Sequence, residues 1–305
     1  KKSGRKKKVH SIWVPESWGK EAFSLLGALA EVTKKVQLGT SIINIYSRSP
    51  ATIAMGATTI DLLSGNRMMI GLGASSPTII ENWHGLMFKK PVLRMRRYIE
   101  CIRRIVTGEK VNYTSEFFQI QNFGLMYEPK RKYIPIFVGA VNEGMLSLAT
   151  EIADGTILYL RPFEELRKTI TKINSRLDKD NKAFNTSCVF ISAISNKHPD
   201  LARERAAKTL AFYIAVGKAY NSFLSKNGYG QEVKEITYQY WTNGGDAAAS
   251  SVPDHMLDAI TISGNREQCI KSLEKFISTG ISLAILQVNP IKKTGEPVEE
   301  ILSVF

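Results

Sequence analysis

The sequence has few cysteines and histidines, and it has no long apolar run. Its three cysteines, Cys101, Cys188 and Cys269, are odd in number and far apart, which argues against a disulfide framework and for a reducing, cytoplasmic location. Its four histidines show no ligand spacing with cysteine or carboxylate, so we expect no metal site. No apolar run approaches the roughly 20 residues that cross a bilayer. Because the lysine-rich start is not followed by an apolar signal core, we expect no membrane partner.

Motifs of several common enzyme classes are also absent. No serine sits in a nucleophile-elbow pattern, no cysteine has a partner histidine nearby in the sequence, and no dinucleotide-binding fingerprint is present. These absences argue against serine or cysteine nucleophiles and against a Rossmann-type dinucleotide site. A triad assembled only in space would leave no such pattern.

Positive charge is in excess, with a formal net charge of +13. Six of the cations lie within residues 1–8, and removing them leaves +7 for the rest of the chain. A terminal basic cluster without a recognition motif is typical of a solvated tail, so we expect no nucleic-acid partner. A second cluster is either a charged outer helix face or an attraction for an anionic ligand, and it comprises Lys89, Lys90, Arg94, Arg96, Arg97, Arg103 and Arg104.

Short apolar segments alternate with amphipathic ones, as in βα units around a parallel sheet. We predict strands at residues 11–14, 36–40, 68–73, 134–139, 155–160, 187–194 and 283–288. We predict helices at 20–34, 50–63, 91–106, 143–152, 162–177, 199–216 and 266–278. A single α/β barrel takes about 250 residues, so one domain is the simplest interpretation of this chain.

One long segment breaks the alternation. Residues 220–258 contain Asn227-Gly228 and Asn243-Gly244-Gly245, which interrupt any long hydrophobic period. Long insertions of this kind are typically functional loops or lids. We therefore predict an irregular insertion at 220–258.

The most informative run is Val-Gln-Leu-Gly-Thr-Ser-Ile-Ile-Asn-Ile-Tyr-Ser-Arg-Ser-Pro-Ala at 36–51. An apolar strand there breaks into a polar turn just before Pro50 opens a helix. Parallel barrels carry their active sites at the carboxyl ends of the strands. The residues from Thr40 to Asn44, which include Ser41 and Ile42, are therefore expected to face a ligand.

This run resembles the bacterial-luciferase-like superfamily, in its coenzyme F-420-dependent (deazaflavin) branch. The resemblance also rests on Ile-Trp-Val-Pro-Glu-Ser-Trp-Gly at 12–19, Leu-Leu-Ser-Gly-Asn-Arg at 62–67, Ile-Gly-Leu-Gly at 70–73, the turn at 262–265 and the C-terminal 301–305. It implies a (β/α)8 TIM barrel over residues 10–305. Residues 1–9 correspond to only a basic tail or the remnant of a first helix, so we expect the family's first βα unit to be missing or replaced here; the alternatives are a misassigned start and the removal of leading residues. The acidic pocket residue that the family's first strand supplies is therefore not mapped onto a position of this sequence.

The resemblance implies a non-proline cis peptide at Ser41–Ile42, which forms a bulge behind the planar ring of the coenzyme. The alternative is an ordinary trans strand end. Family members often carry aspartate and histidine where this chain has Glu16 and Ser17, so that correspondence is partial. Glu16 either exchanges a proton beside the ring or caps the following helix. Ser17 is a predicted coenzyme contact, and Trp18 is a predicted pocket wall.

Two small-residue turns match family contacts with the coenzyme. The first follows the strand at 68–73 and contains Gly73, Ala74, Ser75 and Ser76. Small residues let a ligand approach the backbone, and the hydroxyls can donate to oxygen anions. The second turn opens a helix whose free amides suit a phosphate, and it contains Gly139, Ala140, Val141 and Asn142.

The leading functional hypothesis is an oxidoreductase that transfers hydride between reduced coenzyme F-420 and a one-carbon group on a tetrahydropterin. Such chemistry needs few protein acids or bases, because the cofactor carries it. The alternatives are an FMN-dependent monooxygenase, another F-420-dependent dehydrogenase acting on a sugar phosphate or alcohol, and a non-catalytic ligand-binding barrel. A homodimer or homotetramer is expected through helices 50–63 and 91–106, with Met55, Met95 and Ile99 exposed at the contact. Otherwise these three residues pack on the barrel.

Overall fold

The computed structural model describes residues 9–177 and 183–291. These residues form two compact units, an N-terminal unit that ends at Ile157 and a C-terminal unit that begins at Leu158. Each unit has its own parallel strands and its own helices. The tail at 1–8 and the motif at 301–305 lie outside the described residues. The single-domain organisation stays a prediction.

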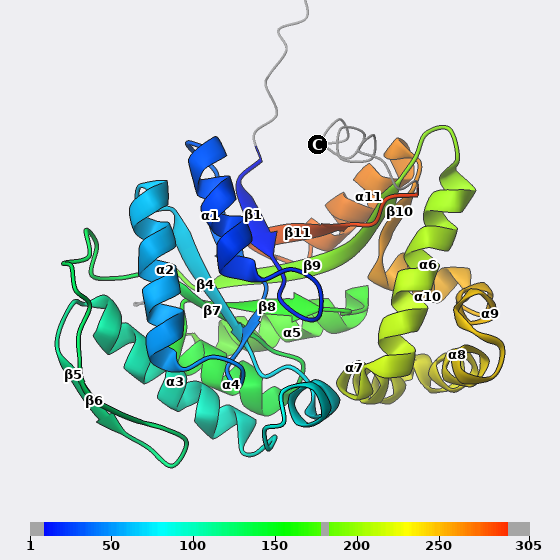
Figure 1. Ribbon diagram of the computed structural model, residues 1–305. Helices are drawn as coiled ribbons and strands as arrows, with labels where there is room; N and C mark the ends of the chain where they lie inside the picture. Colours follow the sequence, from blue (N-terminus) through cyan, green and yellow to red (C-terminus); the bar gives the residue numbers. More distant parts are fainter. Residues whose placement is uncertain (1–8, 178–182, 292–305) are drawn as a thin grey trace, which may run out of the picture. The chain divides into compact units, whose positions relative to one another are not determined.

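The N-terminal unit is built from βα repeats with one antiparallel hairpin (Figure 1). Its strands are β1 (Ser11–Val14), β2 (Gln37–Thr40), β3 (Ile43–Asn44), β4 (Met68–Gly73), β5 (Val111–Thr114), β6 (Gln119–Phe123), β7 (Ile136–Gly139) and the start of β8 (Gly155–Tyr159). Its helices are α1 (Ala22–Val32), α2 (Pro50–Ser64), the π-helix η1 (Ile79–Trp83), α3 (Pro91–Val106) and α4 (Glu143–Ile152). The predicted strands and helices of this region are confirmed, with ends that shift by up to two residues.

The main sheet of this unit runs in the order β1-β2-β4-β7-β8, and all of its pairs are parallel. β2 pairs with the first half of β4, and β3 pairs with its second half. Because the strands are parallel, their carboxyl ends lie at one edge of the sheet. Apolar side chains of the strands and helices, such as Leu26, Leu38 and Ile70, are fully buried.

Local sequence signals explain where α2 begins and ends. Ser49 caps the helix by accepting a hydrogen bond from the Thr52 amide at 3.1 Å, and Pro50 occupies the first turn. Gly65 ends it in the left-handed conformation at φ 69°. Ser49-Pro50 at the start and Gly65 at the end are therefore the sequence signals that mark the two ends of α2.

Arg67 joins the carboxyl ends of two helices. Its side chain is buried and donates to the carbonyls of Ala30, Thr33 and Ser64, at the ends of α1 and α2, and to Val36. A cation at a helix carboxyl end is favourable, because the helix dipole places partial negative charge there. The motif at 62–67 is therefore structural and lies at the amino end of β4, away from the strand ends that carry sites.

The basic cluster on α3 is engaged in contacts within the unit. Arg94 donates to the Ile45 carbonyl, Arg96 pairs with Glu151, Arg97 with Glu100, Arg103 with Asp154, and Arg104 donates to the Asn112 carbonyl. These pairings fit the charged-face alternative. The predicted exposure of Met95 and Ile99 is wrong, since both are buried in the core. Met55 is exposed as expected.

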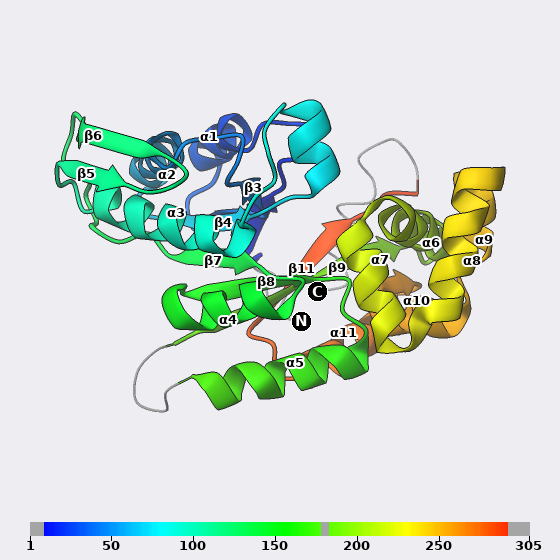
Figure 2. The same cartoon turned by 90° about the horizontal axis from the view of Figure 1, so that it is seen from below.

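The C-terminal unit continues the βα alternation and then becomes helical (Figure 2). Its elements are the end of β8, α5 (Phe163–Arg176), β9 (Asn185–Ile194), α6 (Pro199–Val216), α7 (Lys218–Leu224), the π-helix η2 (Ser225–Tyr229), α8 (Gly230–Asn243), α9 (Gly245–Ser250), α10 (Asp254–Ile260), β10 (Ile262–Gly264), α11 (Arg266–Ile277) and β11 (Leu283–Val288). β11 pairs in parallel with the first part of β9, and β10 pairs with its end.

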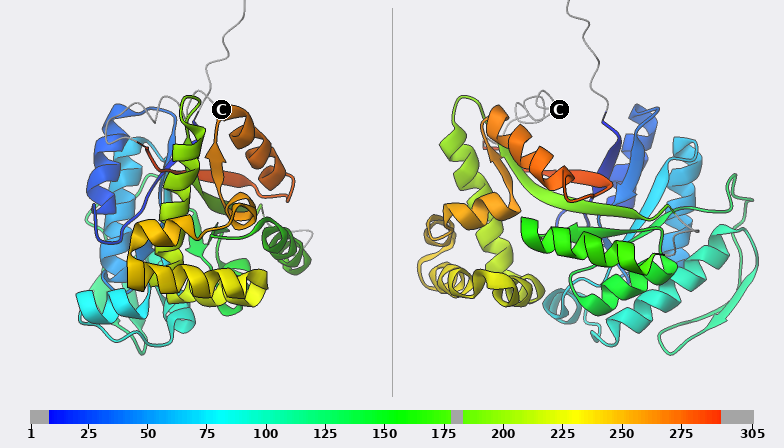
Figure 3. Two further views of the ribbon diagram at one scale, coloured as in Figure 1. Left: turned by 90° about the vertical axis from the view of Figure 1, so that its right-hand side faces the viewer. Right: turned by 180° about the vertical axis from the view of Figure 1, so that it is seen from behind.

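The predicted irregular loop at 220–258 is wrong, because this segment folds into α7, η2, α8, α9 and α10. These helices pack beside α6, as Figure 3 shows. They share a core with residues that include Leu210, Val233 and Met256. The helices end where Gly228 and Gly244 adopt positive φ values of 95° and 89°. The glycines thus mark the ends of helices rather than a loop. That the segment is an insertion stays a prediction.

Three buried thiols lie among the described residues. Cys101, Cys188 and Cys269 are all free and buried. Burial raises the pKa of the Cys101 thiol to about 11 and those of Cys188 and Cys269 to about 12. Because the thiolate is the reactive form, all three stay protonated and inert at neutral pH.

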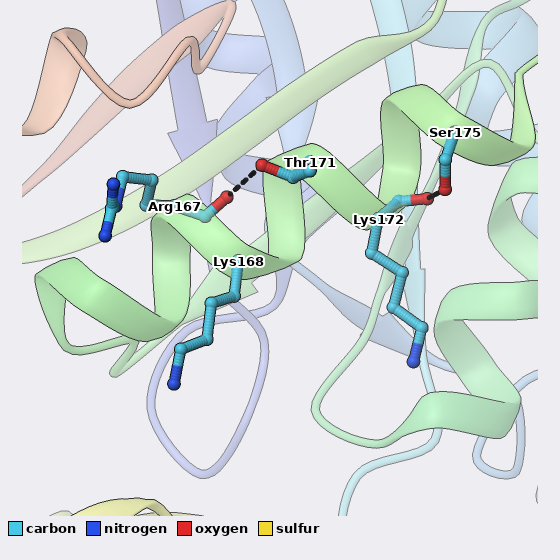
Figure 4. A pocket seen from close by; sticks show the side chains of 5 residues that line it. All are labelled: Arg167, Lys168, Thr171, Lys172 and Ser175. Atoms are coloured by element: carbon cyan, nitrogen blue, oxygen red, sulfur yellow. Dashed lines mark hydrogen bonds between the residues drawn. The ribbon is translucent and has the colours of Figure 1, made fainter.

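A shallow hollow on α5 collects cationic side chains (Figure 4). Arg167 and Lys168 pair with Glu164 and Glu165 one turn earlier on the same helix. The hydroxyl of Thr171 donates to the Arg167 carbonyl at 3.1 Å. Such pairs describe a solvated helix face, so we assign no site to it.

Candidate active site

The predicted site residues all lie in the N-terminal unit, at or just after the carboxyl ends of its parallel strands. β1, β2, β3, β4 and β7 end at Val14, Thr40, Asn44, Gly73 and Gly139. The loops that follow these strands therefore open from the same edge of the sheet. This is the edge at which α/β folds build their sites.

Thr40 is used inside the sheet. It is fully buried, and it lies where β4 changes partner from β2 to β3. Its hydroxyl accepts from the Gly71 amide at 2.8 Å and donates to the Gly71 carbonyl at 2.9 Å. The N–H and the C=O of Gly71 therefore both have the Thr40 hydroxyl as a hydrogen-bond partner. The structure thus gives Thr40 a positioning role, and a direct coenzyme contact stays a prediction.

The peptide bond between Ser41 and Ile42 is cis, so the form that the resemblance implied is confirmed. The segment is tied to β1 and its loop on both sides. The Ser41 amide donates to the Val14 carbonyl at 2.9 Å, and the Glu16 amide donates to the Ile42 carbonyl at 3.3 Å. Ser41 and Ile42 are half-buried, so they lie between the core and the strand-end surface.

The Ile42 side chain lies over two glycines on neighbouring strands. A Cβ added at Gly73 would come within 2.4 Å of Ile42 Cδ1, and one at Gly139 within 3.4 Å of Ile42 Cγ2. Only a residue without a side chain fits at 73 while Ile42 holds this place. Ile42 thus spreads an apolar surface across the ends of β4 and β7.

Glu16 binds Arg48 and the start of α1. Its carboxylate accepts from Arg48 Nε at 3.1 Å and Nη2 at 2.9 Å, and from the Ala22 amide at 2.9 Å. This is the helix-capping alternative, reinforced by an ion pair. The structure therefore favours a positioning role for Glu16, and proton exchange by this residue stays a prediction. Ser17, next to it, is exposed.

Glu21 completes the ionic group around Arg48. It caps α1 by accepting from the Phe23 and Ser24 amides at 2.9 and 2.7 Å, and it pairs with Arg48. Although burial raises the pKa of Glu21, hydrogen bonds from Ser24 and Phe23 and the Arg48 charge lower it overall to about 2. Hydrogen bonding to Glu16 raises the pKa of Arg48 above its usual value, so Arg48 and Glu21 are both ionised at neutral pH.

The turn after β4 exposes its serines. Ser75 is exposed with φ 62°, and Ala74 and Ser76 are half-buried. The Ser76 carbonyl accepts from the Ile80 amide at 3.0 Å, which starts η1. Ser75 therefore lies on the strand-end surface, and its contact with a ligand stays a prediction.

The turn after β7 leads directly into α4. The Ala140 amide donates to the Ile157 carbonyl at 3.2 Å, and Val141 is half-buried. Asn142 caps α4 by accepting from the Met145 amide at 3.0 Å. Glu143 lies in the first turn, where its negative charge opposes binding of an anion by the same helix end.

Asn44 shapes the turn that leads into α2. Its side-chain oxygen accepts from the Tyr46 and Ser47 amides at 3.0 and 2.7 Å, and the residue is 5% exposed. Asparagine stabilises such turns by standing in for a backbone carbonyl. Asn44 therefore fixes the chain that presents Arg48.

Sequence reasoning missed three participants in this region. Arg48 lies within the run at 36–51 without a local signal for its role, and only the structure shows that it binds Glu16. Trp13 and Phe137 meet edge to face at 5.3 Å below the strand ends. A Cβ at Gly39 would come within 2.5 Å of the Trp13 ring. Large residues that lie opposite glycines on a neighbouring strand were the sequence signal that could have identified the two aromatic residues.

A tyrosine cluster lies in the C-terminal unit near the ends of β8 and β11. The Tyr159 ring meets Tyr213 at 5.1 Å and Tyr220 at 5.5 Å, and its hydroxyl donates to Gln287 at 2.6 Å. Burial raises the pKa of all three phenols, so they remain neutral.

The parallel βα units and the site at their carboxyl ends define an α/β barrel-type enzyme fold. The family model described as luciferase-like monooxygenase matches residues 6–283, and the chain belongs to this family. The predicted fold class, a barrel of the luciferase-like type, is confirmed, and so is the expectation of an oxidoreductase of this family.

Two relatives in sequence and one solved structure are similar to most of this chain. A 5,10-methylenetetrahydromethanopterin reductase of Archaeoglobus fulgidus is 30% identical over 292 residues, covering 92% of this chain and 86% of the relative. A putative coenzyme F-420-dependent oxidoreductase of Mycobacterium tuberculosis is 28% identical over 300 residues, covering 90% and 86%. A solved coenzyme F-420-dependent tetrahydromethanopterin reductase from Methanopyrus kandleri has a TM-score of 0.83 at 20% identity, covering 96% of this chain and 88% of that one. This last likeness concerns the fold.

Proposed function

We propose that this protein transfers hydride between coenzyme F-420 and a one-carbon group on a tetrahydropterin. The observation that carries the proposal is the apolar surface of Ile42 across Gly73 and Gly139, at the strand ends of a chain 30% identical to a methylenetetrahydromethanopterin reductase. The second relative, a putative F-420-dependent oxidoreductase, supports the choice of coenzyme.

The residues present fit a planar coenzyme. The Ile42 side chain occupies the space above Gly73, so the strand ends offer a smooth apolar surface rather than a cleft in the backbone. Ser75 stands exposed on the same edge and can donate to ring or tail oxygens. Gly139, Ala140, Val141 and Asn142 would line the path of the coenzyme's phosphate, with Glu143 as an opposing charge that the fit must accommodate.

When bound, coenzyme F-420 supplies a ring carbon that carries hydride as an electron pair. The chain's own residues then have two tasks, which are to orient the ring and to keep water from it. Ile42 would support one ring face, and the loop held by Glu16 and Arg48 lies beside Ile42. Holding two reacting carbons in contact supplies several kcal/mol of the barrier reduction, so no protein acid or base is required at this step.

The acceptor, the location and the assembly state are part of the same proposal. A tetrahydropterin is the acceptor that the Archaeoglobus relative's name indicates. Three buried free thiols suit a reducing, cytoplasmic location. We expect a homodimer or homotetramer that binds small molecules and no nucleic acid. No helix within 9–177 and 183–291 has the length and apolar character of a bilayer crossing.

A paired titration tests the coenzyme. We expect oxidised F-420 to bind at micromolar concentration and FMN to bind at least a hundredfold more weakly. Tight FMN binding without F-420 binding would favour a monooxygenase, the reaction in the family model's description. With F-420 bound, stopped-flow reoxidation of the reduced coenzyme by methylene-tetrahydropterin, seen as the return of the oxidised coenzyme's colour, tests the acceptor. Reoxidation by a secondary alcohol's ketone or by a sugar lactone instead would redirect the proposal to another F-420-dependent dehydrogenase.

A further inference from the structure

Two half-exposed tryptophans meet at the strand-end edge of the N-terminal unit. Trp18 lies in the loop after β1, and Trp83 ends η1 after β4. Their side chains are 57% and 54% exposed. The ring centroids are 5.6 Å apart, and the ring planes are nearly perpendicular at 86°. The loop and η1 lie on the same side of the unit in Figures 1 and 2.

Both tryptophans are held on ordered supports. The Glu16 amide is bonded to the Ile42 carbonyl, and the Glu16 carboxylate is bonded to Arg48. Trp18 is therefore only two residues from a point fixed beside Ile42. Trp83 follows the fully buried Ile80, which anchors η1 in the core. The two supports fix the backbone near both tryptophans, which lowers the entropy that these parts of the protein lose when a ligand binds.

We propose that Trp18 and Trp83 form a stacking corner for the planar heterocycle of the hydride acceptor, beside the coenzyme surface of Ile42. The inference rests on the proposed function for the identity of the acceptor. In a perpendicular pair, a flat ring can stack on the face of one indole while its edge meets the other. Indole rings are amphipathic, so they suit a polar heterocycle that is partly in water.

The size of the corner favours a small molecule over a second copy of the chain. A stable protein interface buries about 800 Å² on each partner, whereas one aromatic side chain buries about 150–250 Å². Leu86 and Met87, which follow Trp83 by three and four residues, add two exposed apolar side chains at 41% and 66% exposure. The apolar area of these four side chains suits a ligand of the size of one fused ring system.

The test is equilibrium binding of tetrahydrofolate, an available tetrahydropterin, by anaerobic calorimetry. Stacking on an aromatic side chain contributes about 1–3 kcal/mol by alanine substitution. We therefore expect Trp18→Ala and Trp83→Ala each to raise the Kd by about 5- to 150-fold. Both side chains are half-exposed, so the unfolding midpoint should not fall appreciably. The matched control is Trp241→Ala, because Trp241 is 68% exposed on α8 and also meets a ring, that of Tyr240, at 5.2 Å and 78°.

Three results would overturn the inference. These are no binding of tetrahydrofolate to the wild type, wild-type affinity in both corner variants, or a loss of affinity in the Trp241 control as large as theirs. Light scattering adds a fourth, namely dissociation of an oligomer in the corner variants at unchanged Kd. The F-420 titration separates this inference from the proposed function. If F-420 binds while the corner variants keep wild-type tetrahydrofolate affinity, only the inference of a stacking corner is contradicted. If tetrahydrofolate binding depends on the corner but F-420 does not bind, only the proposed coenzyme is contradicted.

Discussion

Thr40→Val tests whether the Thr40 hydroxyl holds the sheet together or holds a ligand. The hydroxyl makes two hydrogen bonds to Gly71, at 2.8 and 2.9 Å, and Thr40 is 0% exposed. Valine keeps the branched shape but has neither donor nor acceptor. Leaving one buried backbone group unsatisfied costs about 1–3 kcal/mol. Because Gly71 loses a partner for both its N–H and its C=O, the free energy of unfolding should fall by about 2–5 kcal/mol.

Urea unfolding followed by circular dichroism measures this loss. The matched control is Thr59→Val on α2, where the hydroxyl is exposed and donates only to the Met55 carbonyl. That change should stay within about 0.5 kcal/mol. The reasoning would be refuted by a loss below about 1 kcal/mol in Thr40→Val together with a tenfold or greater fall in F-420 affinity. That pair of results would mean that the hydroxyl faces the coenzyme instead of Gly71.

Three further perturbations address the neighbouring contacts. Arg67→Ala removes the donors shared by two helix ends and should lower the free energy of unfolding by about 3–5 kcal/mol; a loss under 1 kcal/mol in urea unfolding would contradict the assignment. Gly73→Ala pushes Ile42 off its place and should weaken F-420 binding at least tenfold, so unchanged affinity would remove Ile42 from the coenzyme surface. Glu21→Gln should cost about 1 kcal/mol at pH 7, discounted because the side chain is 40% exposed. Since the folded pKa is about 2 against 4.5, that contribution is complete above pH 4.5 and lost toward pH 2, and a wild-type advantage that persists at pH 2 would disprove it.

Long periodic elements were predictable from the sequence. The strands at 11–14, 68–73 and 283–288 and the helices at 91–106, 143–152 and 199–216 have the ends predicted for them. Their signals are local, because apolar runs define the buried strands, and capping residues or prolines define the helix starts. Two-residue and three-residue strands such as β3 and β10 were missed, since so short a segment carries no period. The β5–β6 hairpin was missed because most of its side chains are exposed or half-buried.

The helical segment after α6 was misjudged for a different reason. Asn227-Gly228 and Gly244 predict breaks in an irregular stretch, but in the structure they lie between helices, where both glycines have positive φ values. α8, with 14 residues between those stops, has its own apolar stripe that includes Val233 and Ile236. An interruption in the hydrophobic periodicity is therefore compatible with an irregular loop and with several short helices. Only the packing against α6 distinguishes these two structures.

The composition of the strand-end site was predicted better than its roles. The turns at Gly73 and Gly139 and the Ser41–Ile42 peptide are brought to one edge as expected. The role of Glu16 depends on Arg48, which is 32 positions away in the sequence, so no local pattern could reveal the pair. Side-chain partners that far apart in the chain become visible only once the strands are in register.

The glycines at the strand ends have a structural role that differs from the one their sequence pattern suggests. Small residues there suggest that a ligand approaches the bare backbone. In the structure, an added Cβ would instead meet the protein itself, namely the Trp13 ring at Gly39, the Thr40 carbonyl at 1.8 Å from Gly71, and Ile42 at Gly73. Each glycine makes room for a residue from the adjacent strand or turn. A coenzyme at this edge would therefore rest on the Ile42 side chain. It follows that the residue to vary when probing ring selectivity is Ile42, while changes at Gly39 and Gly71 report on folding.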